Sequence, residues 1–274
     1  MLPTLVIFFR ESLEASLIVG IILAYLHRVG RGDGARAIWT GVGAAIALDL
    51  AVALATFRLI AQYDGSTLQT ILEGSTYFIA TALLTAMSFW MKRQGGNLRG
   101  ELESQVRAAL GRGSILALVA VSALTVGREG LETAFFTLAI AFRATSLQLA
   151  LGAAIGLLCG LAVSWWIYRL GRRAPLGLFF NVLGVLLLLF AAGLLADGIQ
   201  AFQSLGWLPV FGQTLWSTAT YLSQDSALGD ILHSLFGYAD APTLLQVGAY
   251  VAFLLAAVAS YTRLGPGRRS PAKS

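Results

Sequence analysis

The 274-residue sequence has little charge, two histidines and one cysteine. The lone Cys159 excludes an internal disulfide and a cysteine-based metal site, and its apolar surroundings favour a packing role. His27 and His233 both flank apolar runs, and the sequence contains no nucleotide-binding loop and no His-Glu-x-x-His pattern. We therefore expect no enzymatic activity.

Charged residues make up 12% of the chain and hydrophobic residues 57%, whereas a soluble domain carries about 25% charged residues. The composition predicts an all-α integral membrane protein. Seven segments reach the length of about 20 apolar residues that a transmembrane helix needs. These predicted spans are 3–26, 37–61, 70–91, 114–141, 146–168, 176–199 and 242–262. Prolines stand at or next to the start of three spans and interrupt none of them.

The basic residues predict the orientation of these spans. Fifteen of the nineteen Lys and Arg residues fall in the alternate connections 26–37, 91–113 and 169–175 and in the tail after the last span. Because cytoplasmic loops collect Lys and Arg, the N-terminus is expected outside and the C-terminus inside. This placement also explains the net charge of +5 without a nucleic-acid partner.

One five-residue pattern occurs twice, each time inside an apolar stretch. The two copies are Arg10-Glu11-Ser12-Leu13-Glu14 and Arg128-Glu129-Gly130-Leu131-Glu132. On a helix the first, second and fifth residues of the pattern share one face. A charged residue at the bilayer centre costs about 2.5–3.5 kcal/mol on insertion scales, so six such residues need compensation.

Two interpretations of the motifs are open. Each Arg could simply neutralise the Glu four residues later, as a structural ion pair. However, four Glu against two Arg leave two net negative charges, which favours a cation site. Glu11, Glu14, Glu129 and Glu132 are then the predicted ligands, and Arg10 and Arg128 balance their charge. Carboxylates without thiols favour hard cations such as ferric iron, Mg, Ca or Mn, and a proton relay is the alternative chemistry.

The motifs also predict the domain organisation. Each lies on the first helix of a three-helix unit, and the predicted orientation inverts one unit relative to the other. We therefore expect a single domain over 1–262, with repeats at about 3–91 and 114–199, an added helix at 242–262 and a basic cytoplasmic tail at 263–274. Gly152, Gly156 and Gly160 form a small-residue ridge for close helix contact, and we expect this contact within the chain rather than between chains.

Other acidic residues have weaker assignments. The long connection between the last two spans holds Asp225, Asp230, His233 and Asp240, and its pattern predicts a short amphipathic helix near 228–233 at the outer surface. Asp225 either caps that helix or joins the other three in a cation-collecting vestibule. Asp49, in the middle of the second span, either pairs with a motif arginine, extends the ion path or serves the structure. Asp197 has no assigned role.

The doubled Arg-Glu-x-Leu-Glu motif in a seven-span chain resembles the oxidase-dependent iron permeases of fungi and bacteria. The resemblance extends from Phe8-Phe9 before the first motif to Thr133-Ala134-Phe135-Phe136 after the second, and includes Phe89-Trp90-Met91 and Leu235-Phe236-Gly237-Tyr238 of the bacterial branch. Glu73-Gly74 resembles the acidic pair that opens the family's third helix, and we expect Glu73 to relay ions from the outer side. Ser12 departs from the family, which usually has Gly there.

The resemblance implies an iron permease of the cytoplasmic (inner) membrane. It implies iron in the ferric form as the transported substrate rather than a cofactor, and an oxidase or a periplasmic iron-binding protein as partner, with membrane lipid around the chain. A homo-oligomer is left open. The alternative function is a proton-coupled carrier or channel for another divalent cation such as manganese, and a further alternative is a scaffold whose charges only pair.

Overall fold

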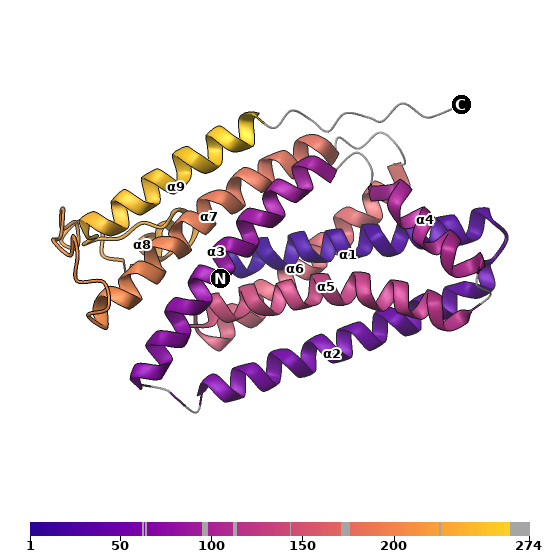
Figure 1. The fold of residues 1–274 in the computed structure, drawn as a ribbon, viewed down its shortest axis with the longest axis horizontal. Helices are drawn as coiled ribbons and strands as arrows, with labels where there is room; N and C mark the ends of the chain where they lie inside the picture. The colour runs from indigo at the N-terminus through magenta and orange to yellow at the C-terminus, as the bar shows by residue number, and fades with distance from the viewer. Residues whose placement is uncertain are drawn as a thin grey trace. The chain divides into compact units, whose positions relative to one another are not determined.

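The computed structural model describes residues 1–61, 63, 65–94, 98–111, 114–142, 144–170, 176–224 and 226–263. These residues form nine α-helices and one 3₁₀ turn (Figure 1). The helices are α1 (Leu2–Arg28), α2 (Ala35–Ala61), α3 (Thr67–Gln94), α4 (Leu98–Gly111), α5 (Ile115–Ala141), α6 (Ser146–Leu170), α7 (Leu176–Ser204), α8 (Ala227–Phe236) and α9 (Leu244–Arg263), and the 3₁₀ turn is η1 (Gly32–Gly34).

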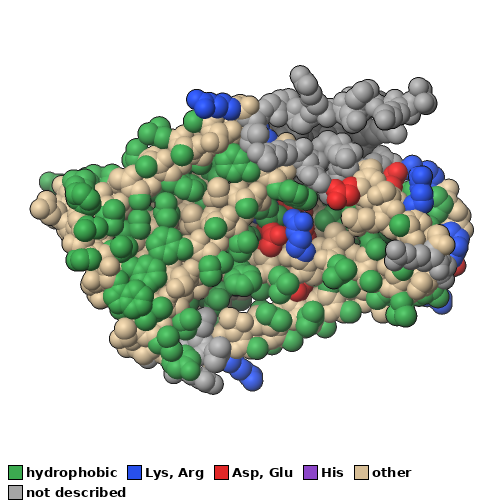
Figure 2. All heavy atoms as spheres, viewed as in Figure 1, with side chains coloured by type: hydrophobic (Ala, Val, Ile, Leu, Met, Phe, Trp, Pro, Cys, Tyr) green, Lys and Arg blue, Asp and Glu red, His purple; other side chains and the backbone are tan. Residues whose placement is uncertain are grey.

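Each of the seven predicted spans is a long helix, with boundaries within a few residues of those expected. By length and composition, α2, α3, α6, α7 and α9 are suited to crossing a membrane. The two other long helices, α1 and α5, have 27 residues each and carry the charged motifs. Hydrophobic side chains predominate on the face shown in Figure 2, and charged groups gather at only a few places.

The chain divides into two compact units. The first comprises residues 3–58 and 96–174 and therefore contains α4, α5, α6 and nearly all of α1 and α2. The second comprises 59–95 and 175–274 and contains α3, α7, α8 and α9. Both motifs belong to the first unit.

The predicted glycine ridge packs within the chain. In the first unit, α6 lies against α1 so closely that a side chain at the ridge would collide with α1 backbone. A Cβ atom added at Gly160 would lie 2.0 Å from the Ser12 Oγ and 2.5 Å from the Phe9 carbonyl oxygen. A Cβ at Gly156 would lie 2.4 Å from the Leu5 oxygen, and one at Gly152 would lie 2.7 Å from that of Met1. The sequence prediction of an intrachain contact is thus confirmed.

The contact between α2 and α5 uses the corresponding positions. When α2 and α6 are aligned at their first residues, Gly41, Ala45 and Asp49 of α2 match the three glycines of the α6 ridge. When α1 and α5 are aligned at their motifs, Ser122 matches Thr4 and Gly130 matches Ser12. A Cβ at Gly41 would lie 2.1 Å from the Ser122 Oγ. At the far end of this contact, Asp49 lies against Gly130.

One helix was missed by the sequence analysis, which treated 91–113 as a connection. Helix α4 buries Leu102, Val106 and Ala109 in the core of the first unit, together with Tyr25 and Leu26 of α1. The Arg107 Nε donates a hydrogen bond of 3.2 Å to the Tyr25 hydroxyl oxygen, and this bond raises the Arg107 pKa.

In the second unit, α3 packs along α7, where the Phe78 and Phe202 rings stack with their centroids 5.6 Å apart. The short helix predicted near 228–233 is α8. Its N-cap is Ser226, whose hydroxyl accepts a hydrogen bond from the Gly229 N–H. At its other end Gly237, with φ of +68°, lies against Gly193 of α7, where a side chain on either residue would crowd the other backbone.

Candidate metal site

The first motif forms a closed ion-pair cluster on α1. The Arg10 Nε donates a hydrogen bond of 2.8 Å to Glu14 Oε1, and a second guanidinium nitrogen lies 3.1 Å from Glu11 Oε1. The Arg10 side chain has no exposed surface. One turn of helix brings the fifth residue of the motif back over the first, which explains the pairing of Arg10 with Glu14.

The second motif repeats this pairing with a more accessible arginine. The Arg128 Nε lies 3.0 Å from Glu132 Oε1 and 3.7 Å from Glu129 Oε1. The Arg128 side chain is 47% exposed, whereas that of Glu129 is only 5% exposed. The two motifs therefore have the same local geometry but different surroundings.

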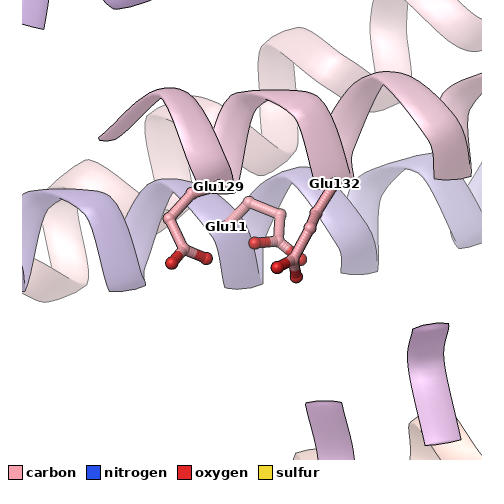
Figure 3. A group of neighbouring side chains, drawn as sticks. All are labelled: Glu11, Glu129 and Glu132. Carbon is pink, nitrogen blue, oxygen red and sulfur yellow. The ribbon is translucent and has the colours of Figure 1, made fainter. Parts of the chain in front are cut away.

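Carboxylates of the two motifs meet between α1 and α5. One oxygen from each of Glu11, Glu129 and Glu132 lies within 4.8 Å of the others. Figure 3 shows Glu11 of α1 beside the two glutamates of α5. In each of the three residues, Oε2 is buried and accepts no hydrogen bond from the described part of the chain. Buried polar atoms are normally satisfied, so these oxygens indicate a missing partner.

A cation is the partner that this arrangement fits. Three carboxylates converge, and the six charged residues of the two motifs have a formal net charge of −2. Carboxylate oxygens without thiolates favour hard or borderline cations, which include iron and manganese. The arginines limit the repulsion between the carboxylates when no cation is bound.

Not every predicted ligand joins this cluster. Glu14 remains on Arg10 and is not among the three converging residues. Asp49 forms no ion pair with a motif arginine among the described residues and instead lies against Gly130. Glu73 belongs to the second unit, where its Oε1 accepts a hydrogen bond of 2.7 Å from the Tyr77 hydroxyl.

The residues of the predicted vestibule have local partners. Asp240 accepts a hydrogen bond of 3.1 Å from the Gln224 N–H, and Asp230 accepts one of 3.4 Å from the Ser234 hydroxyl. Asp225 lies outside the described residues.

His233 is buried. Its Nδ1 lies 2.6 Å from the Tyr238 carbonyl oxygen and its Nε2 lies 3.6 Å from Asp197 Oδ2. The sequence analysis missed this pair, because no local pattern relates a residue of α7 to one of α8.

Comparisons with a family model and with individual proteins both match this chain to iron permeases. The model of the iron permease FTR1 family matches residues 1–262. A protein of Yersinia pestis named ferrous iron permease EfeU is 37% identical over 254 residues, which cover 92% of this chain and 90% of the relative. A protein of the same name from Escherichia coli O157:H7 is 35% identical over 257 residues, or 93% of each chain. No solved structure matches the chain.

The family match spans both motifs and reaches all seven long helices. The comparisons confirm the resemblance inferred from the motifs, and they support a transporter rather than an enzyme. The chain belongs to the iron permease FTR1 family and is a multi-pass transport protein of the inner membrane.

Proposed function

We propose that this protein carries iron across the inner membrane by way of the carboxylate cluster of Glu11, Glu129 and Glu132. The observation that carries the proposal is the convergence of these residues from two helices, with an unsatisfied buried oxygen on each. An iron ion at this point offsets the cost of three neighbouring carboxylates. The same ion loses its hydration shell more readily where carboxylate oxygens replace water.

The charged neighbours have distinct roles in this proposal. Arg10 is fully buried between Glu11 and Glu14 and holds the first motif together. Arg128 is half-exposed, so it is the arginine that an entering ion displaces from Glu132. Glu14 lies about one turn from Glu11 on the same face of α1. It binds the ion when the ion leaves the central cluster.

The proposed architecture is seven membrane spans in an inverted repeat over 1–262, with the N-terminus outside and the basic tail 263–274 inside. The helix contacts support this arrangement, because the positions by which α6 packs on α1 correspond to those by which α2 packs on α5. Figure 1 shows α1 and α5 running in opposite directions, as an inverted repeat requires.

Ions reach the site from the outer side in this scheme. Glu73 acts as the outer relay, with its carboxylate oriented by Tyr77. The acidic residues Asp230 and Asp240, with Asp225 and His233, form the proposed vestibule of the connection between α7 and α9. An oxidase or an iron-binding protein outside the inner membrane supplies the iron, and the transporter acts as a monomer or a homo-oligomer.

Two redox states of iron are candidates. The family resemblance of the motifs implies ferric iron, and the carboxylate ligands suit a hard trivalent ion. The curated relatives are named ferrous iron permeases, and the formal charge of −2 on the two motifs matches a divalent ion. Three carboxylates can bind iron in either redox state, so transport measurements with each state are needed to distinguish them.

The test is uptake of radioactive iron into liposomes that contain the purified chain. Ferrous iron kept reduced by ascorbate, ferric citrate and manganese are supplied separately. Glu129→Gln should lower uptake at limiting iron by at least about tenfold, which corresponds to 1.4 kcal/mol of binding. Glu101→Gln, an exposed carboxylate on α4, is the matched control and should transport as the wild type does. Wild-type uptake in Glu129→Gln would refute the site, and preference for manganese would favour the alternative substrate.

A further inference from the structure

Asp49 is a buried carboxylate that the proposed iron site does not use. It lies in the middle of α2, is 8% exposed, and its Oδ1 has no hydrogen-bond partner in the described residues. Its neighbours Leu48 and Leu50 are 62% and 59% exposed, as expected of side chains that face lipid. The carboxylate therefore points away from lipid into the contact between α2 and α5.

Packing does not account for a carboxylate at this position. In the corresponding contact between α6 and α1, Gly160 faces Ser12 and the helices meet without a charged group. Asp49 occupies the place of Gly160, and Gly130 occupies the place of Ser12. A Cβ at Gly130 would lie 1.7 Å from Asp49 Oδ2 and 3.0 Å from Asp49 Cβ, so a side chain at position 130 would displace the Asp49 carboxylate. A glycine and serine pair would fill the same space without a buried carboxylate.

The charged motif residues of α1 and α5 form ion pairs within their own motifs. On α5, Arg128, Glu129 and Glu132 interact with one another. On α1, Arg10 is held by Glu11 and Glu14. Within the described chain no Lys or Arg nitrogen lies within 4.0 Å of the Asp49 carboxylate. Gly130 points to a different side of α5 from Glu129 and Glu132, at about 100° and 200° around the helix, so Asp49 is separate from the iron ligands.

A buried carboxylate without a cation partner is costly as an anion, and the smallest ligand that relieves the cost is a proton. Among the described residues Asp49 belongs to no group of three or more converging metal-ligand side chains, which argues against a metal ion there. We propose that Asp49 is a proton-binding site that is loaded from the outer side and emptied to the inner side as iron is imported. Protonation forms one O–H bond and removes one negative charge, and release reverses both.

The contact with Gly130 relates this site to the second motif. A change in the charge of Asp49 acts on the backbone between Glu129 and Glu132, the two α5 ligands. The inference thus rests on the proposed function and names a coupling ion for it. It requires iron uptake to be accompanied by proton entry, which the iron site alone does not require.

The test uses the full chain in liposomes that contain a pH-sensitive dye, with the redox state of iron that the wild type takes up. Wild-type uptake should acidify the lumen and should rise by up to about tenfold per unit of falling external pH, the limit for one proton site. Asp49→Asn keeps the shape but cannot ionise, so it should exchange iron while losing lumen acidification and the pH dependence. The exposed Asp33→Asn is the matched control and should behave as the wild type does.

A second variant covers the case in which Asp49→Asn does not fold. Asp49→Gly combined with Gly130→Ser copies the contact of Gly160 with Ser12, so it should fold and show the same loss of proton entry. Infrared difference spectra between acid and alkaline pH should show a carboxylic-acid band that both variants lack. The assignment is overturned if either variant acidifies the lumen as much as the wild type does, or if either variant retains the carboxylic-acid band.

Failure of this inference is distinguishable from failure of the iron site. Iron uptake by the wild type without lumen acidification overturns the role of Asp49 and leaves the iron site intact. Full uptake by Glu129→Gln overturns the iron site whatever happens to protons. Absence of any iron uptake by the wild type overturns both.

Discussion

The glycine ridge on α6 allows a direct test of how tightly the first motif is held. Gly160→Ala adds one methyl group at the point where α6 meets α1. The new Cβ would lie 2.0 Å from the Ser12 Oγ and 2.5 Å from the Phe9 carbonyl oxygen, far below van der Waals contact. The hydroxyl can rotate away, but the backbone oxygen cannot, so the two helices must separate next to Glu11.

The magnitude follows from two opposing effects. Overpacking of this kind costs about 1–3 kcal/mol. Replacing a helical glycine by alanine contributes up to about 1 kcal/mol in favour of folding. Gly43→Ala on α2 measures the second effect alone, because no atom lies within 4 Å of a Cβ built there. We expect the two variants to differ in stability by about 1–3 kcal/mol, with Gly160→Ala the less stable.

The assay is thermal unfolding of the purified protein in detergent, followed by loss of the monodisperse peak. Ser12→Gly introduced with Gly160→Ala should restore stability only in part, because the Phe9 oxygen stays in place. Equal melting temperatures for Gly160→Ala and Gly43→Ala would refute the close contact of α1 with α6. Full restoration by Ser12→Gly would show that the hydroxyl, and not the backbone, is the obstacle.

Three further predictions concern transport and orientation. Glu14→Gln should impair iron uptake less than Glu132→Gln does, because only Glu132 is in the central cluster, and uptake by both variants at limiting iron checks this order. Glu73→Gln should slow uptake at low iron more than at saturating iron, and equal losses at all concentrations would argue against a capture role. A reporter fused to the C-terminus should be active in the cytoplasm and one inserted after residue 215 should read as outside; finding both on one side would contradict the seven-span orientation.

Much of the fold could be predicted from the sequence, because long apolar runs and their polar boundaries determine where membrane helices form. The helix spacing of Gly152, Gly156 and Gly160 correctly indicated a close intrachain contact. Helix α4 was missed because its buried residues are few and lie among charged ones, so the segment looked like a basic loop.

The candidate site was predictable in composition but not in its details. The spacing within each motif placed Arg10 beside Glu14 and Arg128 beside Glu132, as observed. Which glutamates converge depends on how α1 and α5 cross, and no local pattern contains that information. For the same reason the sequence could not place Asp49 against Gly130, a contact between residues that are far apart in the chain.

The glycine ridge has a mechanical consequence. At three successive turns a glycine of α6 faces a backbone carbonyl oxygen, that of Met1, Leu5 or Phe9, so at these points the two segments meet backbone to backbone. Sliding or rotation of either helix would break these contacts, so we expect the pair to move as one body. The contact of α2 with α5 ends instead at the rotatable side chain of Asp49. A motion that changes the distance from Glu11 to Glu129 and Glu132 is therefore expected to move α5 relative to the pair formed by α1 and α6.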